Sequence, residues 1–326
     1  MPRLRWGLLS TARINRLIIP AVRASARSEI AAVASRTPER ARTYAAEWNI
    51  PRVLASYEAM IADPDLDVIY IGLPNSLHAE WTVRCLDAGK HVLCEKPLAL
   101  SVDDVDRVQQ AATRTKRVAA EAFMYRHHPL THAAATVVRS GELGDIRGYK
   151  GAFTFRLTRE GDVRLDPALG GGSLWDVGCY PVSYACFLAG AAPSEVTGWQ
   201  NASTDGIDLE FAGMMRFADG SIAQFDSGFR GPVRAEMEVI GTRGSLRIVR
   251  PFRTDTTSRL LLTIGEDTET LPFDADAPFA GEVADMEGAA LDGAAPEIPL
   301  SESRRTIATI CALYDAARSG RAIRPM

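Results

Sequence analysis

The sequence has few cysteines and few histidines, and it has no long apolar run. Its five cysteines form no C-x-x-C pair and show no zinc-like spacing with the five histidines. Scattered thiols of odd number are typical of a reducing compartment, so we expect a cytoplasmic protein without a disulfide framework. No stretch approaches the ~20 apolar residues of a membrane helix, and the N-terminus has no signal-peptide pattern. We therefore expect neither a metal site nor a membrane partner.

The chain also lacks an excess of positive charge. Lys and Arg number 37 against 41 Asp and Glu, which gives a formal net charge of −4. This balance argues against nucleic acid as a partner, although a local basic patch could still bind one small phosphate ligand. At 326 residues the chain exceeds the ~250–300 residues that one hydrophobic core usually supports, so two domains are expected.

The first ~120 residues predict a doubly wound parallel sheet, the Rossmann arrangement. Short apolar runs alternate with helical stretches there, which is the pattern of strands covered by helices on both faces. Thr37 with Pro38 is a plausible start for one helix, and Ser101 with Asp104 forms a capping-box-like start for another. The expected strands are Leu4–Ser10, Glu29–Ser35, Val68–Ile71, His91–Cys94 and Val118–Ala120.

Past Tyr125 the pattern changes to alternating runs separated by turn residues, which predicts an α+β domain with a large, mostly antiparallel, open-faced sheet. We expect residues 1–124 to form the first domain and residues 125–300 the second, with a last helix in 301–326 that packs back on the first. The expected strands of the second domain are 145–155, Val196–Asn201, Leu209–Phe217, Ile222–Phe225, Met237–Ile240, Leu246–Val249 and Leu260–Ile264.

Unusual polar residues follow several of the predicted parallel strands. Ligands of open parallel sheets lie beyond the carboxyl ends of the strands, so these residues should converge on one crevice. Each segment alone is compatible with ordinary turn chemistry, and their convergence is what indicates a binding site. The segments are Ser10–Ala12, Ser35–Thr37, Leu73–Ser76 and Glu95–Pro97.

Two expected features of a dinucleotide site are missing. Ser10 and Ala12 replace the glycines of G-x-G-x-x-G, yet they are small enough for a backbone to approach pyrophosphate at a helix N-terminus. The second strand ends without the usual Asp or Glu and leads to Ser35, Arg36 and Arg40. A 2′-phosphate would balance an arginine at a helix start, so we predict NADP(H), with NAD(H) as a permitted alternative. A plain turn with a solvated arginine would have the same residues.

Two groups suit proton transfer at an alcohol. Lys96 leaves the fifth strand and could polarise a hydroxyl, and Pro97 after it could follow a cis bond. Asp176 and Tyr180 are four apart on a predicted helix that opens with glycines. A phenol can act as acid or base when a cation such as Lys96 lowers its pKa. A surface lysine and a buried Tyr–Asp hydrogen bond are the alternatives.

The remaining candidates are pocket residues. His78 follows the turn at Asn75 and is predicted to line the cofactor site, although histidines are less informative than the strand-end segments. His127 with His128 lies just past the domain junction, where a histidine pair at a helix start without function is the alternative. We predict that substrate contacts come from Arg126, His127, Asp162 and Arg164, besides Lys96, Asp176 and Tyr180.

Together these motifs resemble the glucose–fructose oxidoreductase/inositol dehydrogenase (Gfo/Idh/MocA) family, most of all its branch of dimeric dihydrodiol and NADP-dependent xylose dehydrogenases. The resemblance keeps its order over most of the first 185 residues. The segments that carry it are residues 5–14 (RWGLLSTARI), 73–81 (LPNSLHAEW), 89–97 (GKHVLCEKP), 121–126 (EAFMYR) and 170–181.

The resemblance implies specific roles for these positions. Lys96 would be catalytic, and Tyr180 would replace the histidine of many relatives, with Asp176 beside it. His127 departs from the pattern, because an aromatic residue is expected there. Residues 1–124 would bind the dinucleotide, and residues 125–300 would bind substrate and pair two or four copies through the open sheet. The implied cofactor contacts are Ser10, Thr11, Ala12, Arg13, Ile14, Ser35, Arg36, Arg40, Leu73, Pro74, Asn75, His78, Glu95, Lys96 and Pro97.

The expected activity is hydride transfer between NADP(H) and a hydroxyl or carbonyl carbon of a sugar, polyol or cyclic diol. A ketoreductase for a nucleotide-linked keto-sugar would use the same groups in reverse. A regulator that binds NADP(H) without catalysis is a third hypothesis, although it would not need Lys96, Asp176 and Tyr180 together.

Overall fold

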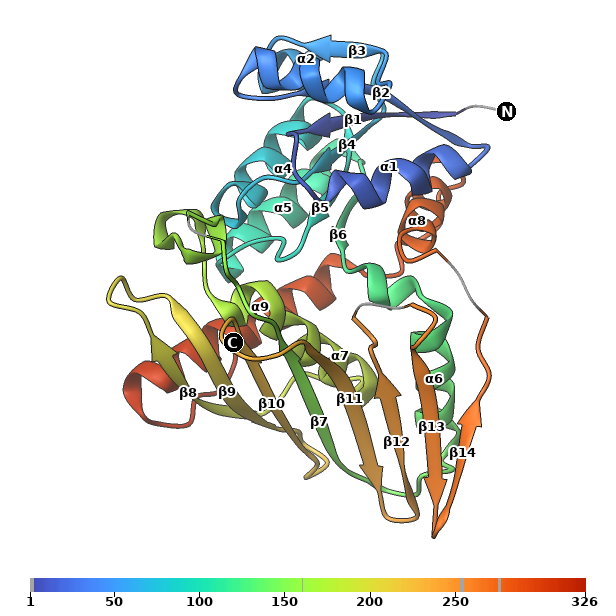
Figure 1. Cartoon of the computed structure of the whole chain (residues 1–326), viewed down its shortest axis with the longest axis vertical. Coiled ribbons are helices and arrows are strands. Elements are labelled where there is room, and N and C mark those ends of the chain that lie inside the picture. The colour runs from blue at the N-terminus through green and yellow to red at the C-terminus, as the bar shows by residue number, and fades with distance from the viewer. Residues whose placement is uncertain (1–2, 160, 253–254, 275–276) are drawn as a thin grey trace. The chain divides into compact units, whose positions relative to one another are not determined.

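A computed structural model of the chain describes residues 3–159, 161–252, 255–274 and 277–326. The chain divides into two compact units, whose elements are labelled in Figure 1. The first unit comprises Met1–Met124 and Phe279–Arg304, and the second comprises Tyr125–Pro278 and Arg305–Met326.

The first unit is built on a six-stranded sheet in which every neighbouring pair of strands is parallel. The strand order is β3-β2-β1-β4-β5-β6, so the winding reverses between β1 and β4. This confirms the predicted doubly wound sheet, although the short edge strand β3 was not expected. The strands are β1 (Leu4–Leu9), β2 (Ser28–Ala34), β3 (Arg52–Leu54), β4 (Val68–Ile71), β5 (His91–Glu95) and β6 (Ala119–Ala122).

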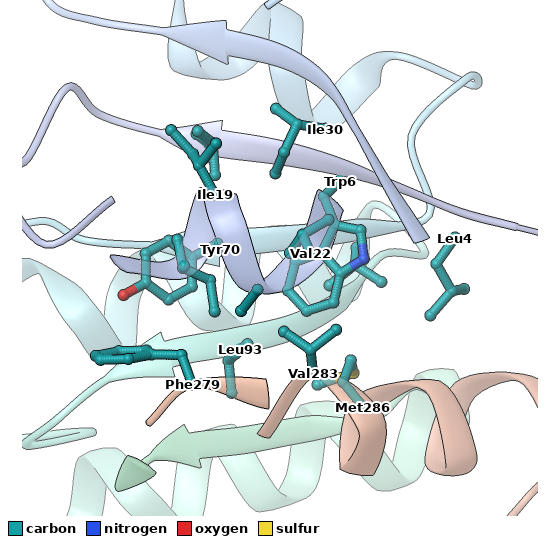
Figure 2. Close-up of a cluster of buried hydrophobic side chains, with 14 of the residues drawn as sticks. Leu4, Trp6, Ile19, Val22, Ile30, Tyr70, Leu93, Phe279, Val283 and Met286 are labelled. Carbon is teal, nitrogen blue, oxygen red and sulfur yellow. The ribbon is translucent and has the colours of Figure 1, made fainter. Parts of the chain in front are cut away.

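Helices cover both faces of this sheet. On one face, α1 and α8 bury Trp6, Tyr70, Leu93, Val283 and Met286 in a single apolar cluster (Figure 2). Each fully buried apolar side chain of this kind contributes roughly 1.5–3 kcal/mol to stability. On the other face α4 and α5 pack against each other (Figure 1). The helices are α1 (Asn15–Ala24), α2 (Pro38–Glu47), α3 (Tyr57–Ala62), α4 (His78–Asp87), α5 (Val102–Thr115) and α8 (Ala280–Leu291).

The second unit contains an eight-stranded sheet in the order β14-β13-β12-β11-β7-β10-β9-β8. The pairing of β7 with β10 is parallel and the other pairings are antiparallel, which confirms a mostly antiparallel sheet. The strands are β7 (Ile146–Thr154), β8 (Glu195–Ala202), β9 (Asp208–Arg216), β10 (Ile222–Gly228), β11 (Arg234–Gly241), β12 (Gly244–Val249), β13 (Arg259–Ile264) and β14 (Asp267–Leu271).

One face of this sheet is buried and the other is open. Along β10, Ala223 and Phe225 are buried whereas Gln224 is exposed, the period-two pattern of a half-covered sheet. The covered face packs against α6 (Pro129–Ser140) and α7 (Cys179–Ala189). The long strands therefore present a continuous row of outward side chains within the second unit.

The C-terminal part of the chain corrects one expectation. The last helix, α9 (Leu300–Ser319), was expected to pack on the first domain, but from Arg305 onward it belongs to the second unit. The reason lies in its contacts, because Tyr314 packs against Phe211 of β9 and Ile323 pairs with Val196 of β8. The segment that returns to the first unit is α8, whose apolar side chains join the cluster of Figure 2.

Candidate active site

The turn after β1 is held by hydrogen bonds at the carboxyl end of the parallel sheet. Ser10 has a φ of 129°, a conformation that costs non-glycine residues about 1–3 kcal/mol. Its Oγ donates to the Gly72 carbonyl oxygen at 2.9 Å and accepts from the Ala12 amide at 3.3 Å. The turn continues through Thr11, Arg13 and Ile14 into α1, which has no side-chain cap and no acidic residue in its first turn. The turn therefore fits a dinucleotide pyrophosphate at the positive end of a helix.

Two arginines follow β2 where NAD-specific sites have an acid. Arg36 and Arg40 are exposed, and neither makes an ion pair among the residues that the structure describes. Ser35 is buried, and its Oγ accepts from the Thr37 amide at 3.4 Å. Burial raises the pKa of Tyr57, while the charge and backbone of Arg36 limit that rise. This corner of the first unit therefore offers two cations and a phenol to an anionic group.

His78 joins two of the predicted segments. Its Nδ1 lies 2.7 Å from the Pro97 carbonyl oxygen, and its Nε2 lies 2.8 Å from the Leu73 carbonyl oxygen. The ring is buried, and burial lowers the pKa of His78. Pro74 and Asn75 follow in a turn that closes when the Leu77 amide donates to the Pro74 carbonyl. The imidazole thus positions the loops after β4 and β5 relative to each other.

Lys96 leaves β5 beside two carboxyl groups. The peptide bond after Lys96 is cis, as the sequence suggested. Glu121 of β6 accepts the Leu98 amide at 2.9 Å, and Glu95 accepts the Tyr70 hydroxyl at 2.5 Å. Burial raises the pKa of Glu121, whereas the positive charge of Lys96 acts in the opposite direction. The ammonium therefore lies within electrostatic reach of a buried carboxyl group that the sequence reasoning did not select.

Tyr180 lies in an aromatic environment at the start of α7. Its ring centroid is 5.2 Å from that of Phe153, 5.3 Å from Phe252 and 5.8 Å from Tyr125. The residue is buried to 9% exposure. The preceding turn, Leu174–Gly178, is π-helical and not α-helical as predicted. Single π turns are frequent at functional sites, and this one carries Asp176.

Asp176 is held by an arginine that the sequence placed in the substrate pocket. Arg164 Nε donates to Asp176 Oδ2 at 2.6 Å, and its Nη1 donates to Asp162 Oδ1 at 3.2 Å. The charge of Asp176, and then that of Asp162, raises the pKa of Arg164 above its ordinary value. The guanidinium therefore neutralises two carboxylates and orients Asp176, which lies four residues before Tyr180.

The glycines before this helix permit close backbone approach. A Cβ atom on Gly171 would lie 2.5 Å from the Arg164 carbonyl oxygen. Gly172 has a φ of 123°, and its amide donates to the same carbonyl at 3.0 Å. The loop that carries Arg164 thus packs directly on the start of the helix, as the predicted role of the glycines requires.

The segment just past Met124 is buried within the second unit. The Arg126 guanidinium lies 3.7 Å from the centre of the Phe187 ring. His127 is also buried, and His128 Nδ1 accepts the Leu130 amide at 3.1 Å, which caps α6. For His128 the structure therefore supports the alternative of a histidine that starts a helix and has no role in the site.

Two absences can be stated for the described part of the chain. It contains no group of three or more His, Cys, Asp or Glu side chains arranged to hold a metal ion. None of its helices combines the length and the apolar character that crossing a bilayer demands.

Comparison with known proteins decides the family. The model of an oxidoreductase family with an NAD-binding Rossmann fold matches residues 4–123, and that of the GFO/IDH/MocA C-terminal domain matches residues 131–247. The chain is 40% identical to D-xylose 1-dehydrogenase (NADP(+)) 2 of Haloferax volcanii over 325 residues, 98% of each chain. The chain belongs to the Gfo/Idh/MocA family.

Two solved structures have a similar fold. The aldose-aldose oxidoreductase from Caulobacter crescentus, complexed with glycerol, superposes with a TM-score of 0.91 at 27% identity, covering 99% of both chains. A 3-ketoreductase from Actinomadura kijaniata, in complex with NADP and TDP-benzene, gives a TM-score of 0.91 at 29% identity and covers 96% of this chain and 98% of its own. As a Gfo/Idh/MocA member, the chain is an NAD(P)-dependent oxidoreductase that acts on CH–OH groups.

Proposed function

We propose that this chain is an NADP(H)-dependent enzyme that moves hydride to or from the hydroxyl carbon of a sugar, polyol or cyclic diol. The observation that carries the proposal is the Tyr180 phenol, seated among aromatic rings on the helix turn after the Arg164-held Asp176. A phenol at this place, with Lys96 as the cation, supplies the acid–base chemistry that alcohol oxidation needs. The Haloferax volcanii relative, an NADP⁺-dependent xylose dehydrogenase by name, supports the same class of substrate.

The cofactor would be held by the first unit. The open N-terminus of α1 and the turn at Ser10 suit the pyrophosphate, and Arg36 with Arg40 suits a 2′-phosphate. The loops that His78 joins, with Glu95 and Pro97, would complete the contacts. When bound, the nicotinamide supplies the hydride acceptor or donor at its C4 atom.

The proton would be moved by Tyr180. In the oxidation direction its phenolate oxygen accepts the proton of the substrate hydroxyl, and in reduction the phenol returns it. A free phenol has a pKa of about 10, so a neighbouring cation is required to make it a base near neutral pH. Lys96 would serve as that cation and would also stabilise the developing alkoxide. Asp176, Arg126, His127, Asp162 and Arg164 are the proposed substrate contacts.

The second candidate is a ketoreductase for a nucleotide-linked keto-sugar, and the Actinomadura kijaniata enzyme favours it through its structural likeness. The ion pairs of Arg164 favour an uncharged sugar, polyol or diol over a nucleotide-linked sugar. Two carboxylates already neutralise this guanidinium, so it would attract a pyrophosphate only weakly. A non-catalytic regulator is the third candidate. It would not need Lys96, Asp176 and Tyr180 together, so their presence argues against it.

The experiment is a screen followed by two substitutions. Aldoses, polyols, inositols, aromatic diols and a nucleotide-linked sugar are tested for NADPH formation or consumption by fluorescence. Lys96→Met and Tyr180→Phe should each lower kcat by ~10²–10⁴ on the best substrate, with NADPH affinity largely kept.

Matched controls are Lys116→Met, at an exposed lysine, and Tyr149→Phe, at a buried tyrosine of β7. Near-normal turnover in a site variant would remove that residue from the mechanism. Tight NADPH binding without turnover of any substrate would favour the regulator.

We also infer that two or four copies associate through the open face of the eight-stranded sheet. Trp199 of β8 projects there with 66% exposure, and Met214 of β9 is also exposed. Ion pairs such as Arg234–Asp226 and Lys150–Glu238 lie farther into the sheet, on β10, β7 and β11. Exposed apolar side chains beside charged ones are typical of a protein interface.

A further inference from the structure

The helix that carries Asp176 and Tyr180 begins without a local cap. Ser173 occupies the N-cap position, where serine usually accepts an amide hydrogen bond from the first turn. Here it makes no such bond, and its hydroxyl instead donates to Asp208 Oδ2 at 2.8 Å. The first amides of the helix must therefore find their acceptor elsewhere, because an uncapped helix start leaves N–H groups unpaired.

The acceptor comes from a distant strand. Asp208, the first residue of β9, is 2% exposed, and its Oδ2 also accepts the Leu174 amide at 2.7 Å. Tyr314 of α9 donates its hydroxyl to Asp208 Oδ1 at 2.6 Å, and the backbone of Trp175 approaches the same phenol. Burial raises the pKa of Asp208, while these donors oppose that rise. The Asp208 carboxylate and the Tyr314 phenol thus supply, from outside the helix, the hydrogen-bond acceptors that a cap residue normally supplies.

The packing around this contact is tight. A Cβ atom on Gly172 would lie 2.2 Å from Asp208 Oδ1 and 2.8 Å from the Tyr314 hydroxyl. Ser227 of β10 extends the contact, since its hydroxyl lies 3.1 Å from that of Ser173. Three separate elements, β9, β10 and α9, therefore define where the first turn of the helix begins.

We propose that Asp208 is a positioning residue that, with Tyr314, sets the register of the π turn and thereby the places of Asp176 and Tyr180. This inference rests on the proposed function for the roles of those two side chains. Its physical basis is that a π turn is rare and occurs mostly as a single turn within an α-helix, so we expect contacts from outside the helix to hold it. Loss of the external cap lets the turn relax, and a shift of ~1 Å at a catalytic group can cost about a hundredfold in rate.

The test compares variants that remove or keep the acceptor. Asp208→Ala should lower kcat about a hundredfold, and Tyr314→Phe about tenfold, while NADPH affinity changes less than about twofold. Asp208→Asn keeps one carbonyl oxygen for Leu174 and Ser173, so its kcat should recover to within about tenfold of the wild type. Tyr149→Phe, a buried tyrosine that packs on Phe217, is the control and should keep the wild-type kcat.

Hydrogen exchange of the Leu174 and Trp175 amides gives a readout that needs no turnover. Exchange there should accelerate in Tyr314→Phe and remain slow in Asp208→Asn and Tyr149→Phe. Unchanged exchange, or faster exchange with an unchanged kcat, would overturn the positioning role. If Asp208→Ala does not fold, Tyr314→Phe and Asp208→Asn decide the question alone. Wild-type inactivity on every substrate would refute the proposed function instead, and the exchange data would still decide whether the external cap exists.

Discussion

Arg36 shows how one side chain can select between two cofactors. Its guanidinium is exposed at the end of β2 and is unpaired among the described residues, so an anionic ligand would gain a full charge-assisted contact. Arg36→Asp should therefore weaken NADPH binding by roughly 1.5–3 kcal/mol and leave NADH binding nearly unchanged. Fluorescence titration with both cofactors measures the difference.

Arg42 offers a matched control for this substitution. It lies on α2, the helix that follows Arg36, but its guanidinium already pairs with Glu39 at 3.2 Å. Arg42→Asp should change the affinity for both cofactors alike. A wild-type protein that binds NADPH and NADH equally well would contradict the role of Arg36.

Glu282 is a buried acid outside the proposed mechanism. Neither of its carboxyl oxygens has a hydrogen-bond partner in the described part of the chain. Burial, and then the charge of Glu95, raises the pKa of Glu282 well above its ordinary value. The folded state therefore holds a proton that the unfolded chain releases above pH ~4.5, so this group costs stability as the pH rises.

Glu282→Gln removes that titration and keeps the shape of the side chain. The variant should match the wild type near pH 5 and exceed it by on the order of 1 kcal/mol at pH 8, as measured by urea unfolding. Glu287→Gln on the same helix is the control, because the Glu287 carboxylate already accepts from Ser25 and Ser28 at 2.5 Å. A constant difference between Glu282→Gln and the wild type across this range would show that Glu282 ionises normally.

At the scale of elements, two helix starts that look alike in sequence differ in structure. Ser101 Oγ accepts the Asp104 amide at 3.2 Å, whereas Thr37 makes no side-chain cap bond to α2. Ser101→Ala should therefore cost about 1 kcal/mol of unfolding free energy, and Thr37→Ala clearly less. Chemical denaturation of both variants checks this, and equal losses would mean that the side-chain cap bond of Ser101 does not decide helix stability here.

The elements that sequence predicted well are those with a strong apolar pattern. The buried parallel strands could be found because both of their faces are apolar. Strand β14 (Asp267–Leu271) is mostly polar and exposed, and β3 has three residues, so neither has a pattern to read. The final helix was predicted as a helix, but the unit that its apolar face meets depends on packing between segments far apart in the sequence.

In the candidate site, too, local sequence patterns were readable and long-range contacts were not. Lys96, Asp176 and Tyr180 could be selected because strand-end positions and helical spacing are local patterns. The pairing of Arg164 with Asp176, the π turn and the external cap from Asp208 depend on long-range contacts and leave no local signal. Sequence therefore named side chains of the candidate site, Arg164 among them, but not the long-range contacts that orient these side chains.

At the scale of the whole molecule, the open sheet face is a surface that one copy leaves uncovered. Charged side chains alternate there with small and apolar ones, and several already form ion pairs between strands of the sheet. Such pairs contribute little while exposed to solvent but become selective when a partner excludes water. The face is lined by Lys150, Trp199, Ala212, Met214, Gln224, Asp226, Arg234, Glu236, Glu238 and Arg247.

Trp199 is the residue of this face whose loss should matter most to assembly. A tryptophan that a partner buries commonly contributes ~2 kcal/mol or more to an interface, so Trp199→Glu should weaken association about thirtyfold or more. Sedimentation velocity over a range of concentrations would show the shift from dimer or tetramer to monomer. Leu17→Glu, at an exposed apolar residue of the first unit, should leave assembly unchanged. A wild-type monomer at high concentration, or a Trp199→Glu variant that assembles like the wild type, would mean that this face does not join the copies.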